Sequence, residues 1–447
     1  MSLLSEQRRI VITGTFGSGK SVLMLSLLHH LSAFDARHFR LGDKRLKRPV
    51  EVKGITSLGV QNSSEGLPYK DHLKRLLRPG GGEWPTKTQA LLRFRGLLRR
   101  SDRFRATRMS LMSFPLERLV DLSLARSPRY DDWCERTLQQ INEDPKGARE
   151  IRRYLHALDA PQLVVPRLFN TYKQALAQFI FHYKPFVSPS TFMIGLDGDR
   201  ITGGAAEAVV QGRFLGLPPL KHEGAREFIP LSGIARLREP EFSEELAKHY
   251  EAYRQTVALP LFRELSQADA LVVLLDIPSL LAAGRPAYDE LSLLLSNLNS
   301  LLPRRDRQGE QLGRSKVKRL ALVANKADLI RLFDRDARIP GLLRELCAPL
   351  VDQLDPRIEV GRFICSPCVS TRPGNQPGQL IGRVIHSGMN PQRLEKPFPV
   401  PELPQSWPRE YAPRDFSFLR VWPPALKPHE VMPPHHRLDD LCRFLLP

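Results

Sequence analysis

The 447-residue sequence has no run of about 18 uncharged apolar residues, which is the minimum for a helix that spans a bilayer. A membrane-spanning helix is therefore excluded on length grounds. The N-terminus also lacks a basic segment followed by an apolar segment and a small-residue cleavage site, so we expect no export signal. These absences predict a cytoplasmic protein, with peripheral attachment to a membrane as the alternative.

Cysteine is scarce and odd in number, which fits a reducing compartment rather than a disulfide framework. Two of the five cysteines, Cys365 and Cys368, form a CxxC pattern. No second CxxC and no histidine pair lies beside it, so we expect neither zinc binding nor redox chemistry there.

Acidic residues are in deficit: 67 Lys and Arg face 48 Asp and Glu, which gives a net charge of +19. Such a field favours polyanions, namely nucleotide phosphates, nucleic acid or an anionic bilayer surface. Hydrophobic residues make up 42% and charged residues 26%, as in ordinary soluble proteins. The length predicts two or three domains, or one domain with large insertions.

A glycine-rich loop, GTFGSGKS at residues 14–21, follows the apolar run 10–13 and precedes a helical pattern with leucines on one face. This strand, loop and helix context is the one in which the GxxxxGK[ST] pattern binds phosphate. The glycines let the backbone approach phosphate oxygens, Lys20 bridges the terminal phosphates and Ser21 coordinates magnesium. The predicted contacts are Gly14, Thr15, Phe16, Gly17, Ser18, Gly19, Lys20, Ser21 and Val22.

The segment VKRLALVANKADLI, residues 317–330, is an apolar strand that ends in NKAD. In an NKxD loop the aspartate accepts from guanine N1 and N2, for which adenine has no matching pair of donors. We therefore predict that Asn325 and Asp328 recognise guanine, and that Asn325 and Lys326 also pack the loop. Ser366, after the strand in RFICSPCVS, is the predicted final base contact. The ligand is then GTP or GDP with magnesium, with ATP or ADP as the alternative.

Hydrolysis needs a second strand that ends in a magnesium-binding aspartate, followed by a DxxG loop. The candidate segment RATRMSLMSFPLERLVDL, residues 105–122, reads as a strand, then SFPL, then a helix. It has neither an aspartate nor a glycine at the required positions.

Over nearly its full length the chain resembles the YcjX-like family of P-loop NTPases, which are bacterial cytoplasmic proteins linked to stress response. The resemblance rests on GTFGSGKS, LPYKDHL, WPTKT, SFPLERLVDL, ALVVLLD, NKAD and PHHRLDDLCRFLL. Family members carry DYPGEW in place of SFPLER, so Ser113 replaces the expected magnesium aspartate and Leu116 the hinge glycine. Members often have TKAD, so Asn325 moves this chain toward the guanine consensus. The resemblance thus implies nucleotide binding with slow or lost hydrolysis.

Two further residues are candidates for the magnesium site. Thr88, in WPTKT, is by resemblance the switch threonine that completes magnesium coordination, and with Lys20 it makes up the predicted catalytic set. Asp276 ends the apolar run 270–276 and is an alternative carboxylate, although a strand-end turn or helix cap is the favoured explanation of it.

The predicted fold is α/β: a three-layer P-loop NTPase fold with a mostly parallel sheet, a helical insertion and a proline-rich C-terminal extension. We assign residues 1–125 and 263–372 to the nucleotide-binding domain and 126–262 to a mainly helical insertion. Residues 373–447 should wrap over the surface. This last segment should contain a strand at DFSFLRVW, residues 415–422, and a final helix that docks through Leu438, Leu441 and Leu445.

Seven arginines lie in RFRGLLRRSDRFRATR, residues 93–108, which we interpret as a solvated hairpin. The alternative is a patch for an anionic membrane or a membrane protein, or less favourably for nucleic acid, aided by Lys44, Arg45, Lys47 and Arg48.

Two other functions stay open: an ATPase or small-molecule kinase, and a non-enzymatic scaffold with a basic face. The sequence predicts no oligomeric state. His435 and His436 are expected to pack rather than bind a metal.

Overall fold

The computed structural model describes residues 6–42, 50–58, 69–78, 81–85, 91–143, 145–183, 188–194, 209–220, 222–299, 302, 304–305, 311–312, 315–385, 395–426, 430 and 433–446. The chain divides into two compact units. Unit 1 comprises Met1–Leu116 and Leu265–Pro447, and unit 2 comprises Glu117–Glu264. No helix in the described part of the chain is both long and apolar enough to cross a membrane.

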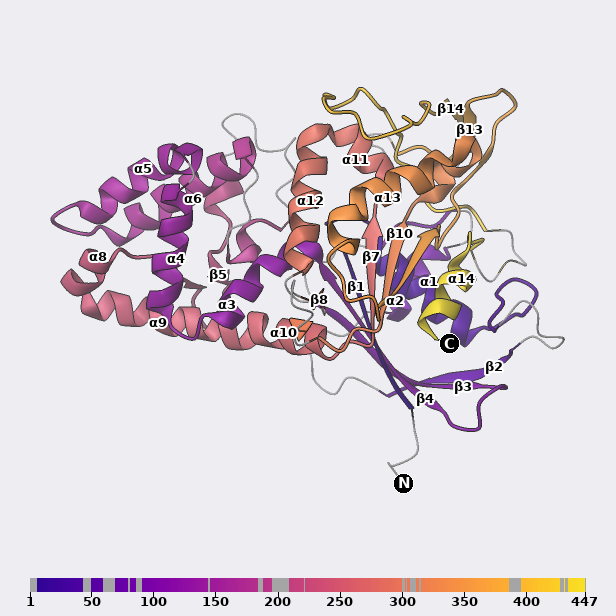
Figure 1. Ribbon diagram of the computed structural model, residues 1–447, viewed down its shortest axis with the longest axis horizontal. Helices are drawn as coiled ribbons and strands as arrows, with labels where there is room; N and C mark the ends of the chain where they lie inside the picture. Colours follow the sequence, from indigo (N-terminus) through magenta and orange to yellow (C-terminus); the bar gives the residue numbers. More distant parts are fainter. Residues whose placement is uncertain are drawn as a thin grey trace. The chain divides into compact units, whose positions relative to one another are not determined.

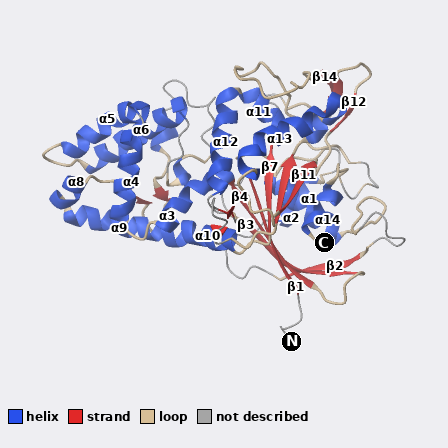
Figure 2. Cartoon of the chain, viewed as in Figure 1, coloured by secondary structure: helices blue, strands red, loops and turns tan. Residues whose placement is uncertain are grey.

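Unit 1 is built on a seven-stranded sheet with the order β11-β10-β7-β1-β4-β3-β2 (Figures 1 and 2). β3 is antiparallel to both of its neighbours, and the other pairings are parallel. This confirms the predicted α/β class with a mostly parallel sheet. The strands are β1 (Glu6–Gly14), β2 (Val52–Ser57), β3 (Leu92–Arg100), β4 (Thr107–Pro115), β7 (Ala270–Leu275), β10 (Arg319–Ala324) and β11 (Glu359–Ile364).

β1 lies where the chain changes direction across the sheet. β4 pairs with one side of β1 and the next central strand, β7, pairs with the other side. The chain leaves the carboxyl end of β1 toward the β4 side and the carboxyl end of β7 toward β10, so the two connections diverge and a crevice opens between these strand ends. Ligands of open α/β sheets bind at such a switch point, and the residues that follow Gly14 lie there.

Helices cover both faces of the parallel part of the sheet. α1 (Lys20–Ser32) and α14 (Leu438–Leu445) share one core with alternate residues of the strands, among them Ile12 and Val272. Leu271 and Val273 point to the opposite face, because successive strand residues alternate. There α13 (Arg338–Val351) packs on β10 and β11 (Figure 1). The other α-helices that lie wholly within the described part of unit 1 are α2 (Tyr69–Leu76), α11 (Ile277–Ala283) and α12 (Arg285–Asn299).

Unit 2 is mostly helical, and its boundary at Glu117 precedes the predicted start of the insertion at residue 126. Its core contains a cluster of aromatic residues: the ring centroid of Trp133 lies 5.1 Å from that of Phe228 and 5.6 Å from that of Tyr250. Its elements are α3 (Leu122–Arg126), α4 (Tyr130–Glu143), α5 (Pro145–Asp159), α6 (Val165–Tyr183), β5 (Gly216–Leu217), β6 (Arg226–Glu227), α8 (Gly233–Arg238), α9 (Pro240–Tyr253) and the first part of α10 (Leu259–Ser266).

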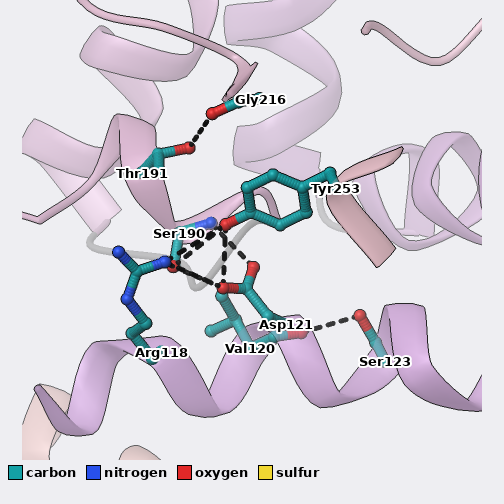
Figure 3. Close-up of polar contacts among 8 residues, drawn as sticks. All are labelled: Arg118, Val120, Asp121, Ser123, Ser190, Thr191, Gly216 and Tyr253. Atoms are coloured by element: carbon teal, nitrogen blue, oxygen red, sulfur yellow. Dashed lines mark hydrogen bonds and ion pairs between the residues drawn. The ribbon is translucent and has the colours of Figure 1, made fainter. Parts of the chain in front are cut away.

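A buried polar cluster stabilises unit 2 around Asp121, whose side chain is fully buried (Figure 3). The carboxylate accepts from the Ser190 amide at 2.8 Å, the Ser190 hydroxyl at 2.5 Å and the Tyr253 hydroxyl at 2.9 Å. The Arg118 guanidinium lies 3.7 Å away. Burial raises the pKa of Asp121, and Arg118 and the hydrogen bonds oppose that rise. The hydrogen-bond donors largely satisfy this buried charge.

The C-terminal region contains more regular structure than its proline content predicts. β12 (Thr371–Pro373), β13 (Gln379–Gly382) and β14 (Lys396–Pro399) form a small antiparallel sheet. The strand predicted at 415–422 is wrong: Val421 makes an isolated bridge with Val384, residues 415–420 form no strand, and none of them is fully buried. The final helix is confirmed as α14, with Leu438, Leu441 and Leu445 buried.

Candidate functional site

Residues 14–21, which we call the glycine loop, turn sharply between β1 and α1. Gly17 and Gly19 have φ angles of 86° and 94°, in the left-handed region that favours glycine. A Cβ on Gly14 would lie 2.6 Å from the Leu274 carbonyl oxygen, and one on Gly19 would lie 2.6 Å from the Asn325 side-chain nitrogen. Close packing therefore favours glycine at Gly14, beside a backbone oxygen, and at Gly19, beside the Asn325 side chain.

Lys20 folds back onto the glycine loop from the first position of α1. Its Nζ donates to the carbonyl oxygens of Gly14 at 2.9 Å and Thr15 at 2.8 Å, and the residue is 8% exposed. An ammonium group held at the N-terminus of a helix adds to the positive end of the helix dipole. The loop therefore concentrates positive potential at the carboxyl end of β1. In the same loop Thr15 and Phe16 are half-buried and Gly17 is exposed, whereas Ser21 and Val22 are half-buried in the first turn of α1.

The NKAD loop contacts the glycine loop directly. The Asn325 side-chain amide donates to the Ser18 carbonyl oxygen at 2.7 Å, across 307 positions of sequence. Two buried atoms at this contact, Ser18 Oγ and Asn325 Oδ1, have no hydrogen-bond partner among the described residues. Buried polar atoms are usually satisfied, so this pair of orphaned atoms marks the contact as a site for a polar ligand or water.

Lys326 and Asp276 link the ends of two neighbouring strands. Lys326 has a left-handed φ of 55°, and its ammonium forms an ion pair with the Asp276 carboxylate. Asp276 also caps α11, because its carboxylate accepts from the Ser279 amide at 3.1 Å and from the Ser279 hydroxyl at 2.6 Å. Of its two predicted roles, the structure therefore supports the helix cap.

Asp328 is buried, with 5% exposure, and its side chain is held in place by the loop after β11. Oδ1 accepts from the Ser366 hydroxyl at 2.8 Å and Oδ2 accepts from the Ser370 amide at 2.9 Å. Burial raises the pKa of Asp328, and these donors act against the rise. Ser366 is fully buried, so its observed contact is with Asp328.

Sequence reasoning missed the support that surrounds Asp328. Ser370 supplies an amide to the carboxylate, and the Thr371 hydroxyl donates to the Asp328 carbonyl oxygen at 2.8 Å. Both residues follow the CxxC turn, whose two cysteines are buried. Burial raises the pKa of both thiols. The run of small hydroxyl residues after Cys368 was the available signal, because such side chains commonly hold a neighbouring loop.

The predicted magnesium side of the site is neutral where a carboxylate was expected. Ser113 pairs in register with Ile12 in the parallel ladder and is 2% exposed, while Leu116 is fully buried. In the described part of the chain no group of three or more His, Cys, Asp or Glu side chains could hold a metal ion. Thr88 lies outside the described residues, as do Lys44, Arg45, Lys47 and Arg48.

His435 packs as predicted. Its ring meets that of His30 at 4.8 Å and that of Phe39 at 5.5 Å, both edge-on, and burial lowers its pKa. These contacts join the end of α1 to the chain just before α14.

Comparison with known proteins gives a match over nearly the whole chain. The model of the family described as YcjX-like family, DUF463, matches residues 8–447. No curated protein matches the chain.

Proposed function

Since the chain belongs to the YcjX-like family, we propose that it is a P-loop protein that binds GTP or GDP. The glycine loop would hold the phosphates and the NKAD loop the guanine base. The observation that carries the proposal is the 2.7 Å bond from Asn325 to the Ser18 carbonyl, because it joins the base-reading loop to the phosphate-reading loop.

Three features fit a bound triphosphate. The glycine loop follows the central strand at the switch point of a parallel sheet, where the N-terminus of α1 attracts anions. Gly14 and Gly19 leave no room for a Cβ, as expected where backbone amides approach a ligand closely. When a triphosphate binds, the Lys20 ammonium would give up one of its two carbonyl contacts and bind the terminal phosphates instead.

Guanine recognition fits the arrangement around Asp328. Each carboxylate oxygen accepts one hydrogen bond from the protein, and each has a second acceptor site. The guanine N1–H and N2–H groups can use these sites, whereas adenine has an acceptor at N1 and no amino group at position 2. Ser366 and Ser370 hold the carboxylate in one orientation, which reduces the entropy lost on binding.

Magnesium fits this chain less well than the nucleotide does. Ser21 would supply a hydroxyl ligand, and nucleotide phosphates with water would supply the rest. The metal would neutralise charge on the phosphates during transfer. Ser113 brings no charge to order its water shell, and the buried Leu116 cannot swing as a glycine does. We therefore propose slow or absent turnover.

A competition experiment tests the proposal. GTP, GDP, ATP and ADP are titrated against a fluorescent guanine nucleotide bound to the full chain. We expect GTP and GDP to displace it at least tenfold better than ATP and ADP. A preference for adenine would favour the ATPase or kinase alternative, and no binding of either class would favour the scaffold.

A further inference from the structure

The excess positive charge of the chain is carried by unit 1. Unit 2 holds 20 Lys or Arg and 20 Asp or Glu, so it is neutral as a whole. Residues 1–116 hold 22 basic and 8 acidic residues, whereas residues 265–447 hold 25 and 20. Most of the net charge of +19 therefore belongs to the segment that forms β1 to β4. A field of this sign draws that part of the protein toward polyanions.

Arginines occupy one face of β3 and β4. Leu92 and Leu98 of β3 point into the core of unit 1, so the alternating Arg95 and Arg99 lie on the opposite face and are exposed. Arg108 of β4 is paired with Leu97 and lies on that same face. Among the described residues, no carboxylate forms an ion pair with Arg95, Arg99 or Arg108. This face therefore presents cations that are available to an external anion.

The turn between β3 and β4 spans residues 101–106 and carries an exposed aromatic side chain. Phe104 has a relative exposure of 112%, the highest among the exposed large hydrophobic residues of the described chain. Arg103 and Arg105 flank it and are also exposed. An apolar ring between two cations at the tip of a hairpin has the composition of segments that bind membrane interfaces.

The base of the turn is fixed by Arg100. Its guanidinium donates to the Asp102 carboxylate at 2.9 Å and 2.6 Å, and to the Leu446 carbonyl oxygen at 2.6 Å. The side chain of Arg100 is 6% exposed. The Arg103 guanidinium also lies 4.0 Å from the Asp102 carboxylate, so the one acidic residue of the turn is outnumbered by the cations beside it. The turn is tied to the end of α14 through Leu446. Phe104 is presented from a rigid base.

We propose that this hairpin tip docks the protein on an anionic phospholipid bilayer. Phe104 enters the boundary between headgroups and acyl chains, and Arg103, Arg105 and Arg108 contact lipid phosphates. A single-stranded nucleic acid fits less well, because stacking sites place aromatic rings among the cations of a groove. Here the exposed ring stands at the tip, beyond the arginine face. The inference does not depend on nucleotide binding.

Flotation of the full chain with vesicles tests this proposal. We expect binding to phosphatidylserine-containing vesicles at low salt, and loss of binding with pure phosphatidylcholine or at high salt. Phe104→Asp should lower the partition coefficient at least tenfold. The pair Arg103→Ala and Arg105→Ala should lower it about 25-fold, at roughly fivefold for each arginine. The matched controls lie in neutral unit 2: Leu237→Asp, at a residue 85% exposed, and the exposed pair Arg152→Ala and Arg153→Ala. These should bind as the wild type does.

A second readout places the ring itself. In Phe104→Trp, anionic vesicles should shift the added indole emission to shorter wavelength, measured as the difference from wild type. Three results would overturn the proposal: no salt-sensitive binding to anionic vesicles, equal binding by Phe104→Asp, or tighter binding to an oligonucleotide that depends on the same residues. Thermal unfolding of each variant shows whether weaker binding results from the changed surface or from an unfolded protein.

Discussion

The side-chain amide of Asn325 donates to the carbonyl oxygen of Ser18, so one hydrogen bond joins loops that lie 307 residues apart in sequence. If the two loops bind one ligand, this bond fixes the distance between the parts of the site that hold the phosphate end and the base end of that ligand. A nucleotide would then meet a preformed site, and the cost of ordering the loops would be low.

Asn325→Ala should weaken guanine-nucleotide binding about tenfold or more, because it removes the bond to Ser18 and frees the NKAD loop. The measurement is titration with a fluorescent GDP analogue. Asn170→Ala, at an exposed position of α6 in unit 2, is the control and should bind normally. Equal affinity of the two variants would mean that the bond has no role in binding.

A matched glycine pair tests the close approach of the two loops. Gly17 and Gly19 both have left-handed φ angles, so alanine strains either by about 1–2 kcal/mol. A Cβ at Gly17 meets nothing within 4 Å, whereas one at Gly19 meets the Asn325 amide at 2.6 Å. Gly19→Ala should therefore lose at least tenfold more affinity for GDP than Gly17→Ala. Similar losses would show that the collision with Asn325 does not matter.

Restoration of the expected acid and glycine tests the cause of slow turnover. Ser113→Asp with Leu116→Gly should raise single-turnover GTP hydrolysis at least tenfold, because a carboxylate then orders the magnesium-bound water. Both residues are buried, so unfolding curves must accompany the assay. Hydrolysis by the wild type at a typical enzymatic rate would contradict the proposed loss.

The cluster around Asp121 should contribute strongly to the stability of unit 2. Asp121→Ala leaves the Ser190 and Tyr253 hydroxyls and the Arg118 cation without their buried partner, at a cost of about 3–5 kcal/mol. Urea unfolding measures the change. Asp159→Ala, on the exposed surface of α5, should change the unfolding free energy by less than about 0.5 kcal/mol. A small effect of Asp121→Ala would mean that the cluster contributes little to the folding stability of unit 2.

His30 should make unit 1 sensitive to acid. Burial, followed by the neighbouring His435, His29 and His38, lowers the pKa of His30 from 6.5 to about 3. Below pH 6.5 the unfolded chain takes up this proton while the folded chain does not. Stability should fall by about 1.4 kcal/mol per pH unit until the folded pKa is reached. Replacement by phenylalanine, which keeps the ring stack on Phe39, should reduce this slope, whereas replacement of the exposed His156 should not.

The local parts of the site could be predicted from sequence, because each is written in consecutive residues. The glycine loop lies between a strand and a helix, and NKAD follows a buried strand, as their patterns predict. The support around Asp328 could not be predicted, since Ser370 reaches it through a turn and a bridge that depend on tertiary packing.

At residues 415–422 the sequence pattern predicts an element that the structure does not contain. Their alternating aromatic pattern predicts a strand, yet prolines at 413, 423 and 424 flank the segment, and within the described residues its pairing is limited to the bridge between Val421 and Val384. Alternation indicates a strand only where a partner strand and a buried face are available, and neither property is local. The ion pair between Lys326 and Asp276 likewise could not be predicted from sequence, because it depends on the order of strands in the sheet.

The most direct test of guanine recognition changes both Asp328 and the base of the nucleotide that is offered to it. Asp328→Asn replaces one acceptor by a donor, which suits xanthine, with N1–H beside a carbonyl, in place of guanine. The Ser366 hydroxyl can accept from the new amide, so the buried side chain keeps its partners. We predict that wild type binds GDP at least tenfold more tightly than xanthosine diphosphate and that the variant reverses this order. If wild type fails to distinguish the two, or the variant keeps the wild-type order, Asp328 does not read a guanine base.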